Sequence, residues 1–349
     1  MKLLLYGINF HPELTGIGKY TGDMVAWLAA RGHEVRVITA PPYYPAWKVS
    51  DGYHAARWHT EDWQGVRVWR CPLWVPGRPG GFTRLFHLTS FAVSSLPVAL
   101  RQVAWRPDVV WVVAPSLLCA PAALAMARLS GARAWLHIQD FEVDAAFDMG
   151  LLQGAWLRRS VLAAERWLLR RFDRVSTISR RMLARLDTKG VAGARQVLFP
   201  NWVDVQALSA DTEAIRGGAQ AYRAQLGIPA MAPVALYSGN MGGKQGLELL
   251  VAVAQLCAER AAPVWFVFCG DGAGRDMLVS ACRGLPQVRF MELQPEGQLP
   301  ALLAMADVHL LPQRADAADL VMPSKLTGML ASGRPVVATA NPGTELAEV

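Results

Sequence analysis

Two glycine-rich turns, one in each half of the chain, contain the residues best placed for chemistry. Gly16 and Gly18 follow an apolar run at residues 2–9, and a second turn at residues 239–246 follows the apolar run at residues 234–238. Turns of this kind at the start of a helix point backbone N–H groups at an anion, usually a phosphate. One turn in each half predicts a phosphorylated ligand held in a cleft between two α/β domains.

The second turn adds a positive charge to its glycines. Asn240 follows the end of the expected strand, and Gly242 and Gly243 allow the backbone to approach a ligand closely. Lys244 places a cation beside the start of the next helix, where a diphosphate would lie. We therefore expect Lys244 to stabilise a departing diphosphate and its neighbours to bind the donor. The alternative is a flexible turn with a surface lysine.

The first turn lacks the signature of a dinucleotide-binding domain. The pattern GxGxxG would require glycine at the position of Thr21, and the expected strand at residues 34–39 does not end in an acidic residue. NAD is therefore not the expected ligand. We expect Gly16 and Gly18 to offer backbone N–H groups to a diphosphate, although a GxG pair also occurs in ordinary helix-entry turns.

Three further groups follow expected strands, where open α/β sheets bind ligands. Gly270 follows the strand at residues 264–269 within the sequence GDG, which is equally consistent with a tight turn. His137 and Asp140 come at the end of another expected strand, and alternation places His137 on the same face as Gln139. Both are candidate contacts to a sugar or an acceptor. A buried histidine with satisfied hydrogen bonds is the structural alternative.

Pro323, Ser324 and Lys325 form the start of an expected helix near the end of the sequence. Proline in a first turn, a hydroxyl group and a lysine together favour an anion at a helix start. We expect Ser324 to contact the donor and Lys325 to join Lys244 in stabilising the departing diphosphate. A simple capped helix is the alternative.

Strand and helix patterns alternate along the whole chain, which is typical of α/β proteins with doubly wound, mostly parallel sheets. The expected strands cover residues 3–8, 34–39, 66–71, 109–113, 132–138, 175–178, 234–238, 264–269, 288–293, 308–312 and 335–339. The expected helices of the first half cover residues 18–31, 83–105, 117–130, 155–172 and 180–187. Residues 41–65 are rich in Pro, Tyr and Trp and are expected to form a long functional loop without a regular element. We expect an N-terminal Rossmann-like domain at residues 1–204, a connection at 205–233 and a C-terminal Rossmann-like domain at 234–349.

The composition is that of a folded protein that meets anionic partners. Of 349 residues, 52% are hydrophobic and 18% are charged, which excludes a disordered chain, and the net charge is +7. No zinc finger or RNA-binding aromatic motif accompanies this charge, so we expect no nucleic-acid partner. The five cysteines form no CxxC pair, which predicts neither a metal site nor a disulfide framework and fits a cytoplasmic setting.

Contact with a membrane is expected at a surface and not through a span. The uncharged residues 109–127 approach the length of a span, but Pro115 and Pro121 interrupt them, which favours a buried strand, a loop and a helix. The helix at residues 155–172 combines five arginines with Trp and Leu, and the helix at residues 83–105 carries several apolar side chains. Such helices can lie on an anionic bilayer, or they can pack on their own sheet and show the arginines to solvent.

These motifs together resemble glycosyltransferase family 4. Residues 11–20 (HPELTGIGKY) resemble its N-terminal loop, and residues 199–204 (FPNWVD) resemble its interdomain signature. Residues 238–248 (SGNMGGKQGLE) and 321–326 (VMPSKL) resemble its donor-binding segments. The similarity covers nearly the whole chain and implies the GT-B fold, in which two Rossmann-like domains face each other.

The resemblance implies a retaining glycosyltransferase that uses a nucleotide-sugar donor and needs no metal or other cofactor. The implied acceptor is a saccharide linked to a polyprenyl diphosphate at the inner face of the cell membrane. The implied pathway is the synthesis of an exopolysaccharide of the colanic acid type. It also favours a GDP-sugar over a UDP-sugar, with fucose as the sugar.

The chain departs from the family pattern at its donor motifs. Asn240 stands where the family usually has a basic residue, and Gln245, one place after Lys244, stands where it usually has lysine. The paired family glutamates fall at Leu320 and Gly328, so we expect Asp319, or else Asp316, to bind the ribose. Family members also continue beyond the position of Val349 with a helix that crosses back to the first domain, so the C-terminal domain is expected to be incomplete.

Two other kinds of function stay open at this point. One is a nucleotide-sugar epimerase of the GT-B fold, which would alter a free sugar nucleotide without an acceptor. The other is a weakly catalytic scaffold subunit of a polysaccharide-assembly complex, which the missing glutamates and the missing tail favour.

Overall fold

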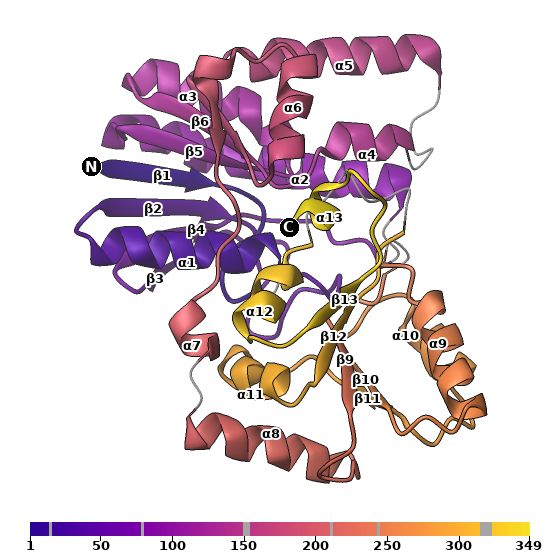
Figure 1. The fold of residues 1–349 in the computed structure, drawn as a ribbon. Helices are drawn as coiled ribbons and strands as arrows, with labels where there is room; N and C mark the ends of the chain where they lie inside the picture. Colours follow the sequence, from indigo (N-terminus) through magenta and orange to yellow (C-terminus); the bar gives the residue numbers. More distant parts are fainter. Residues whose placement is uncertain (14–15, 78–79, 149–153, 210–211, 243–244, 315–322) are drawn as a thin grey trace. The chain divides into compact units, whose positions relative to one another are not determined.

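The computed structural model describes residues 1–13, 16–77, 80–148, 154–209, 212–242, 245–314 and 323–349. The chain divides into two compact units, Met1–Pro200 and Asn201–Val349 (Figure 1). Each unit is an α/β structure with its own mostly parallel sheet, which confirms the expected fold class.

The described residues of the first unit form an eight-stranded sheet in the order β3-β4-β2-β1-β5-β6-β7-β8, in which β3 runs antiparallel to its neighbour. Its strands are β1 (Lys2–Tyr6), β2 (Glu34–Thr39), β3 (His59–Trp63), β4 (Val66–Arg70), β5 (Val109–Ala114), β6 (Arg133–Ile138), β7 (Arg174–Thr177) and β8 (Gln196–Leu198). The central strands β1 and β5 are continuous apolar runs because helices cover both of their faces.

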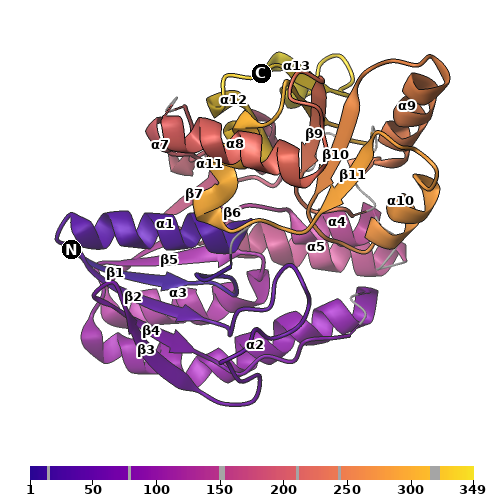
Figure 2. The same ribbon diagram turned by 90° about the horizontal axis from the view of Figure 1, so that it is seen from below.

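Helices cover the two faces of this sheet unequally. They are α1 (Ile17–Ala30), α2 (Gly81–Gln102), α3 (Ala120–Ser130), α4 (Glu142–Asp148), α5 (Ala155–Leu169) and α6 (Arg180–Thr188), with short 3-10 turns η1 (Val103–Trp105), η2 (Leu117–Cys119) and η3 (Gly193–Arg195). Helix α1 lies on one face of the sheet, and α2 and α3 lie on the other (Figure 2). The chain therefore leaves β1 and β5 in opposite directions, which places the reversal of strand order between them.

The expectation of a loop without regular structure at residues 41–65 is wrong. Strand β3 lies in this segment and pairs with β4, joining His59 to Arg70 and Trp63 to Val66. It is an edge strand whose side chains are all exposed or half-buried, so no alternation of apolar and polar residues marks it in the sequence.

The described residues of the second unit form a five-stranded parallel sheet in the order β11-β10-β9-β12-β13. Its strands are β9 (Val234–Ser238), β10 (Trp265–Cys269), β11 (Val288–Met291), β12 (Val308–Leu311) and β13 (Val336–Ala338). Its helices are α7 (Val205–Ser209), α8 (Glu213–Gln225), α9 (Glu248–Glu259), α10 (Arg275–Ala281), α11 (Leu299–Ala304), α12 (Lys325–Ala331) and α13 (Glu345–Glu348), with the turn η5 (Glu296–Gln298).

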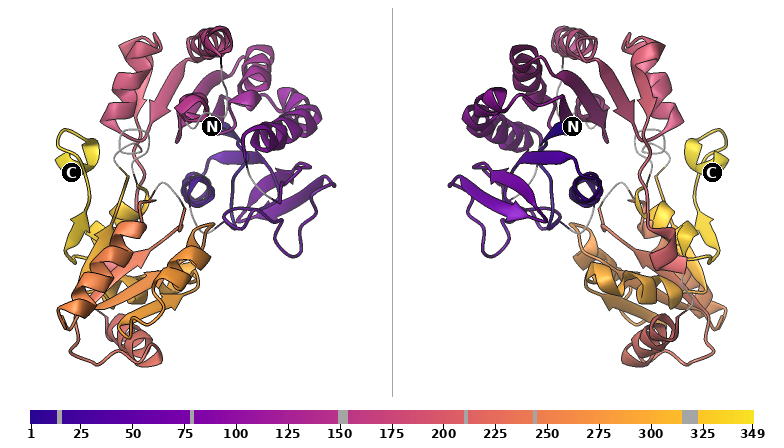
Figure 3. Two further views of the ribbon diagram at one scale, coloured as in Figure 1. Left: turned by 90° about the vertical axis from the view of Figure 1, so that its right-hand side faces the viewer. Right: turned by 90° about the vertical axis from the view of Figure 1, so that its left-hand side faces the viewer.

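Strand alternation builds two cores around this sheet. Ala235 and Tyr237 of β9 pack with α9 and α10, whereas Val234 and Leu236 pack with α8 and α11. Helices accordingly flank the sheet on both faces in the views of Figure 3. The carboxyl ends of its strands are left to the connecting turns, which carry the candidate site.

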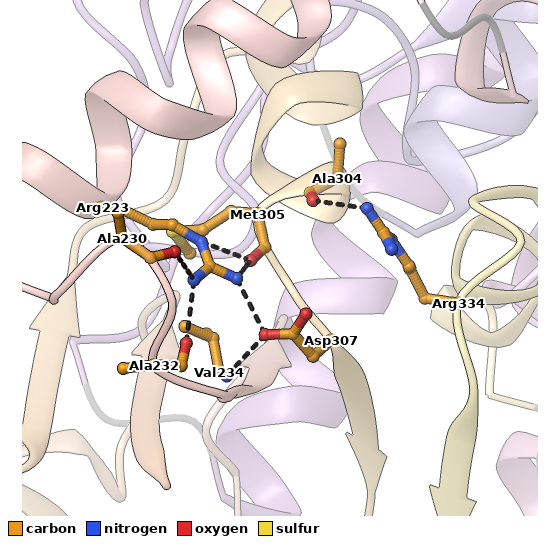
Figure 4. A network of polar contacts seen from close by, with 8 residues as sticks. All are labelled: Arg223, Ala230, Ala232, Val234, Ala304, Met305, Asp307 and Arg334. Carbon is orange, nitrogen blue, oxygen red and sulfur yellow. Dashed lines mark hydrogen bonds and ion pairs between the residues drawn. The ribbon is translucent and has the colours of Figure 1, made fainter. Parts of the chain in front are cut away.

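Arg223 of α8 holds the opposite, amino-terminal edge of the second sheet together. Its guanidinium donates hydrogen bonds to the carbonyl oxygens of Ala230, Ala232 and Met305 and forms an ion pair of 2.8 Å with Asp307 (Figure 4). Asp307 also accepts a hydrogen bond from the backbone N–H of Val234, at the start of β9. This network ties α8 to the sheet and has a structural role.

The apolar run at residues 109–127 forms β5, η2 and the first part of α3, which confirms the expected strand, loop and helix. Within the described part of the chain, no helix is both long and apolar enough to cross a bilayer.

Candidate functional site

In the second unit the strand order reverses between β9 and β12, the position at which open α/β sheets bind ligands. Gly239, Asn240 and Gly242 follow β9, and Gly270 follows the adjacent β10. The structure therefore brings these predicted residues to one edge of the sheet. The predicted residues Gly243, Lys244, Asp316 and Asp319 lie outside the described residues.

The turns after β9 and β10 pack backbone against backbone. A Cβ atom on Gly270 would lie 2.0 Å from the carbonyl oxygen of Gly239, and Gly270 has a φ of +139° that other residues rarely adopt. The backbone N–H of Met241 donates a hydrogen bond of 2.8 Å to the carbonyl oxygen of Asp271. Gly270 is thus needed for the shape of the site, whether or not it touches a ligand.

Lys325, the first residue of α12, reaches the same edge. Its Nζ donates a hydrogen bond of 2.7 Å to the phenol oxygen of Tyr237 and lies 3.9 Å from the centre of that ring. A Cβ atom on Gly239 would lie 3.4 Å from this Nζ, so the ammonium group lies next to the turn after β9. The preceding Ser324 is exposed.

The charge of Lys325 depends on its surroundings. Burial lowers its pKa to about 7, and no carboxylate among the described residues forms an ion pair with it. Near neutral pH the lysine is therefore present in both its charged and its neutral form. An anion bound at this edge would favour the charged form and would draw a proton to Nζ.

Two residues at this edge were not among the predicted site residues. Tyr237 is fully buried in β9, and its hydroxyl donates a hydrogen bond of 2.6 Å to the carbonyl oxygen of Asn240 while it accepts one from Lys325. Gln245 has a buried Oε1 without a hydrogen-bond partner among the described residues. A tyrosine one residue before a Ser-Gly turn is the only sequence signal for the first of them.

In the first unit the reversal of strand order lies between β1 and β5. Gly16 immediately precedes α1, the helix that follows β1, and Gly18 is in its first turn. Gly16 is the N-cap of α1, with φ +65°. A Cβ atom on Gly18 would lie 2.5 Å from a carboxylate oxygen of Glu13 and 3.2 Å from the carbonyl oxygen of Phe10. Gly18 therefore has a packing role that the sequence reading did not include.

Glu13 joins three segments at this edge and was also missed from the sequence. Its Oε1 accepts hydrogen bonds of 3.1 Å from the backbone N–H groups of Tyr43 and Tyr44, and its Oε2 accepts one of 2.9 Å from Asn9. Burial raises its pKa to about 7, although these hydrogen bonds oppose the rise. A lone glutamate in the sequence HPELTG carries no signal for such a role.

His137 and Gln139 lie on one face of the sheet, as strand alternation predicted, and they contact each other. The Nε2 of His137 lies 3.0 Å from the amide nitrogen of Gln139, and its Nδ1 lies 2.9 Å from the hydroxyl of Ser176. The histidine is buried, which lowers its pKa to about 3 and keeps it neutral. Both ring nitrogens thus have partners inside the first unit. Asp140 follows half-buried, and its carbonyl oxygen accepts the backbone N–H of Glu142.

Comparison with known proteins agrees with this architecture. Residues 15–202 match the family described as "Glycosyl transferase 4-like domain", and residues 232–349 match "Glycosyl transferases group 1". The chain is 48% identical over 358 aligned residues to a protein of Escherichia coli K12 described as a colanic acid biosynthesis glycosyl transferase, WcaI. That alignment covers 100% of this chain and 86% of the relative.

Two solved structures share the fold. Sucrose-phosphate synthase from Thermosynechococcus elongatus matches with a TM-score of 0.72 at 17% identity, over 100% of this chain and 83% of that one. Anabaena HepE in complex with UDP and glucose matches with a TM-score of 0.64 at 16% identity, over 97% of this chain and 80% of that one. Both likenesses show the GT-B fold alone. With two glycosyltransferase domain matches and a relative that is 48% identical over 100% of this chain, this chain belongs to the family 4-like glycosyltransferases.

Proposed function

We propose that the protein transfers a sugar from a nucleoside diphosphate, bound at the edge of the second sheet, to a saccharide acceptor on a lipid diphosphate, bound by the first unit. The observation that carries this proposal is the ammonium of Lys325 beside Gly239, at the position where α/β sheets bind ligands. The 48% identical relative supports a place in exopolysaccharide synthesis of the colanic acid type.

The chemistry asks the site to stabilise negative charge. The anomeric carbon exchanges its bond to a diphosphate oxygen for a bond to an acceptor hydroxyl oxygen, and the hydroxyl proton leaves with the diphosphate. We assign the stabilisation of that diphosphate to Lys325 and Lys244, with backbone N–H groups of Gly242 and Gly243. Gly16 and Gly18 keep the role expected from the sequence, in which their backbone N–H groups are offered to a diphosphate. Retention of the anomeric configuration follows from the resemblance to family 4.

The remaining predicted residues take supporting roles in this proposal. Asn240, Gly270 and Ser324 shape or contact the donor, and Asp319 holds its ribose. His137 is a positioning residue, since both of its ring nitrogens bind inside the first unit, and it orients the strand end that carries Asp140. We assign the contact with the sugar or the acceptor to Asp140.

The finer assignment of the donor is a GDP-sugar with fucose, which rests on the resemblance to enzymes of colanic acid synthesis. UDP is the competing nucleotide, because HepE was solved with UDP and glucose and shares the fold. The two bases can be separated by direct binding.

We also propose that the enzyme works at the inner face of the cell membrane through helices α5 and α2. Trp156 and Trp167 of α5 are exposed and fall about 20° apart around the helix axis, at roughly 100° per residue. Exposed arginines flank them on both sides: Arg159, Arg166, Arg170 and Arg171. Exposed tryptophans between arginines suit an anionic bilayer surface.

Helix α2 adds an apolar stripe to this proposal. Its exposed apolar side chains are Phe82, Leu85, Phe86, Val93, Leu96 and Leu100. They fall within about 100° around the helix axis, whereas His87 and Phe91 point into the unit. A stripe of this length on an exposed helix marks an interaction surface.

A thermal-shift series with GDP, UDP, ADP, their sugar conjugates and NAD tests the donor assignment. A ligand at about 100 times its Kd adds roughly 2.7 kcal/mol to the free energy of unfolding. Stabilisation by GDP alone supports the proposal as stated, and stabilisation by UDP alone would mean that the donor is a UDP-sugar. Stabilisation by no nucleotide, or conversion of a sugar nucleotide without an acceptor, would overturn it.

A further inference from the structure

Among its described residues the first unit has three buried polar atoms without a partner: Nε1 of Trp111, in β5, and two atoms that share Arg84 as a charged neighbour. One is Nε2 of His87, in α2, whose side chain is only 1% exposed. The other is Oε2 of Glu142, the first residue of α4. Buried polar atoms are nearly always hydrogen-bonded, so two in one region indicate a missing partner.

Nε2 of His87 is a hydrogen-bond acceptor, and Oε2 of Glu142 is one whenever the carboxyl group is ionised. The Nδ1 of His87 lies 2.8 Å from the carbonyl oxygen of Trp74 and so carries the proton, which leaves Nε2 with a lone pair. The Oε1 of Glu142 accepts the backbone N–H of Leu117 at 2.6 Å, which fixes the orientation of the carboxylate. The missing partner must therefore donate a hydrogen bond to His87, and to Glu142 in its ionised form.

Arg84 is the charged neighbour that these two groups share. Burial lowers the pKa of His87, and the charge of Arg84 lowers it further. Burial raises the pKa of Glu142 to about 7, and the same charge of Arg84 opposes that rise. Among the residues that the structure describes, Arg84 acts on Glu142 through its charge alone, and its guanidinium forms neither an ion pair nor a hydrogen bond. A donor group is therefore available beside two acceptors.

Aromatic rings form a wall next to His87. The ring centre of Tyr43 lies 4.7 Å from that of His87, and the ring centre of Trp47 lies 5.2 Å from it. Trp47 has a φ of +51°, which is a strained conformation for a bulky residue and is typical of functional sites. The Glu13 carboxylate holds the backbone of Tyr43 in place.

The chemistry of these groups selects among ligands. A phosphate offers mainly acceptors, so it could bind Arg84 but could not donate to both His87 and the ionised form of Glu142. A sugar hydroxyl both donates and accepts, and adjacent hydroxyls can donate to the two acceptors while an oxygen accepts from Arg84. An aromatic wall suits the apolar C–H face of a sugar ring.

From this arrangement we infer that Arg84, His87 and Glu142, with the rings of Tyr43 and Trp47, form the subsite that binds adjacent hydroxyl groups of the acceptor saccharide. The inference rests on the proposed function for its biological meaning, since it names the part of the acceptor that the first unit recognises. Arg84 and His87 lie on the inward side of α2, away from its exposed apolar stripe. One helix would thus face lipid on one side and saccharide on the other.

The test measures binding of methyl glycosides of glucose, galactose, fucose and glucuronic acid to the whole protein by saturation-transfer NMR and calorimetry. Glu142→Gln keeps the shape and the bond to Leu117 but replaces the free acceptor oxygen by an amide donor. Arg84→Gln removes the donor charge. Each change should weaken binding of the preferred glycoside roughly tenfold, the scale of one hydrogen bond to a charged group. Arg101→Gln, at an exposed position near the end of the same helix, is the matched control and should change nothing.

Three outcomes would overturn the inference. They are no glycoside binding by the wild-type protein, wild-type affinity for the glycoside in both site variants, and displacement of the glycoside by inorganic phosphate. Nucleotide binding, measured on the same samples, separates this inference from the proposed function. Retained nucleotide binding with unchanged glycoside affinity defeats the subsite alone. Glycoside binding that depends on Arg84 and Glu142 without any nucleotide binding supports the subsite and defeats the donor proposal.

Discussion

The ammonium of Lys325 donates a hydrogen bond of 2.7 Å to the hydroxyl of Tyr237, and that hydroxyl donates one of 2.6 Å to the carbonyl oxygen of Asn240. A residue of α12 is thereby joined to the turn that follows β9. The same contact keeps the lysine away from solvent and beside the place proposed for the donor diphosphate. Occupancy of the site and the charge of Lys325 should therefore depend on each other.

We expect nucleotide binding to take up a proton at Lys325. Its pKa is lowered to about 7, so at pH 8 most of the free protein carries a neutral lysine, and a bound diphosphate should restore the charge. Calorimetry at pH 8 in buffers of different ionisation enthalpy should detect uptake approaching about one proton per nucleotide. Lys325→Met should abolish the uptake and weaken binding roughly tenfold or more.

Lys48→Met, at an exposed position of the first unit, is the control and should bind as the wild type does. Equal proton uptake by wild type and Lys325→Met would remove Lys325 from the donor site. The same pKa also affects stability. The unfolded chain binds this proton up to about pH 10.5, so the contribution of Lys325 to the free energy of unfolding should rise between about pH 7 and pH 10.5.

Gly270→Ala should damage the site through the backbone. The added Cβ would meet the carbonyl oxygen of Gly239 at 2.0 Å, and a φ of +139° is itself unfavourable for alanine. We expect a loss of unfolding free energy on the order of 2 kcal/mol or more, together with loss of nucleotide binding. Gly284→Ala is the matched control, because it also has positive φ but a Cβ there would meet open space. Equal losses in the two variants would contradict the close approach.

Glu13→Gln should change how stability depends on pH. Burial raises the pKa of Glu13 to about 7 from an ordinary value of 4.5, so between these values the folded state binds a proton that the unfolded state lacks. The contribution of Glu13 to the free energy of unfolding therefore falls as the pH rises through this range. Glutamine does not titrate. In urea unfolding, the free energy of unfolding of the variant relative to that of the wild type should rise by more than about 1 kcal/mol between pH 5 and pH 8.

The control for this experiment is Glu259→Gln, which replaces an exposed carboxylate at the end of α9. The difference in free energy of unfolding between this variant and the wild type should stay constant with pH. A constant difference for Glu13→Gln as well would show that Glu13 is ionised in the folded protein throughout this range.

The exposed face of α5 should bind anionic vesicles. Replacing Trp156 and Trp167 by serine removes the two exposed rings without touching the buried Leu168 and Leu169. Co-sedimentation with phosphatidylglycerol vesicles should fall several-fold, and the remaining binding should weaken further with salt because arginines supply it. The same substitution at Trp27, an exposed ring stacked with Arg31 at 4.0 Å on α1, is the control. Equal losses from α1 and α5 would exclude a specific surface.

The sequence was sufficient for the fold class and for most of the strands. The expected strands at residues 34–39 and 234–238 coincide with β2 and β9. β9 is a run of mostly apolar residues, and β2 begins with alternating polar and apolar residues, and both patterns are typical of strands. β3 was not predicted, because an exposed edge strand needs no apolar pattern in the sequence. The roles of the predicted donor-site residues remain predictions.

The candidate site contains some residues that local sequence signals identify and others that they do not. Glycine-rich turns after strands are local signals, so Gly239, Asn240, Gly242 and Gly270 could be selected by reading along the chain. Partners that lie far apart in the sequence could not be selected in this way. Tyr237 and Lys325 are 88 positions apart, and Glu13 and Tyr43 are 30 apart, yet each pair forms a hydrogen bond. Local patterns specify strands and turns because backbone conformation and burial act over neighbouring residues. Which side chains meet, and how burial shifts their pKa, depends on how distant segments pack.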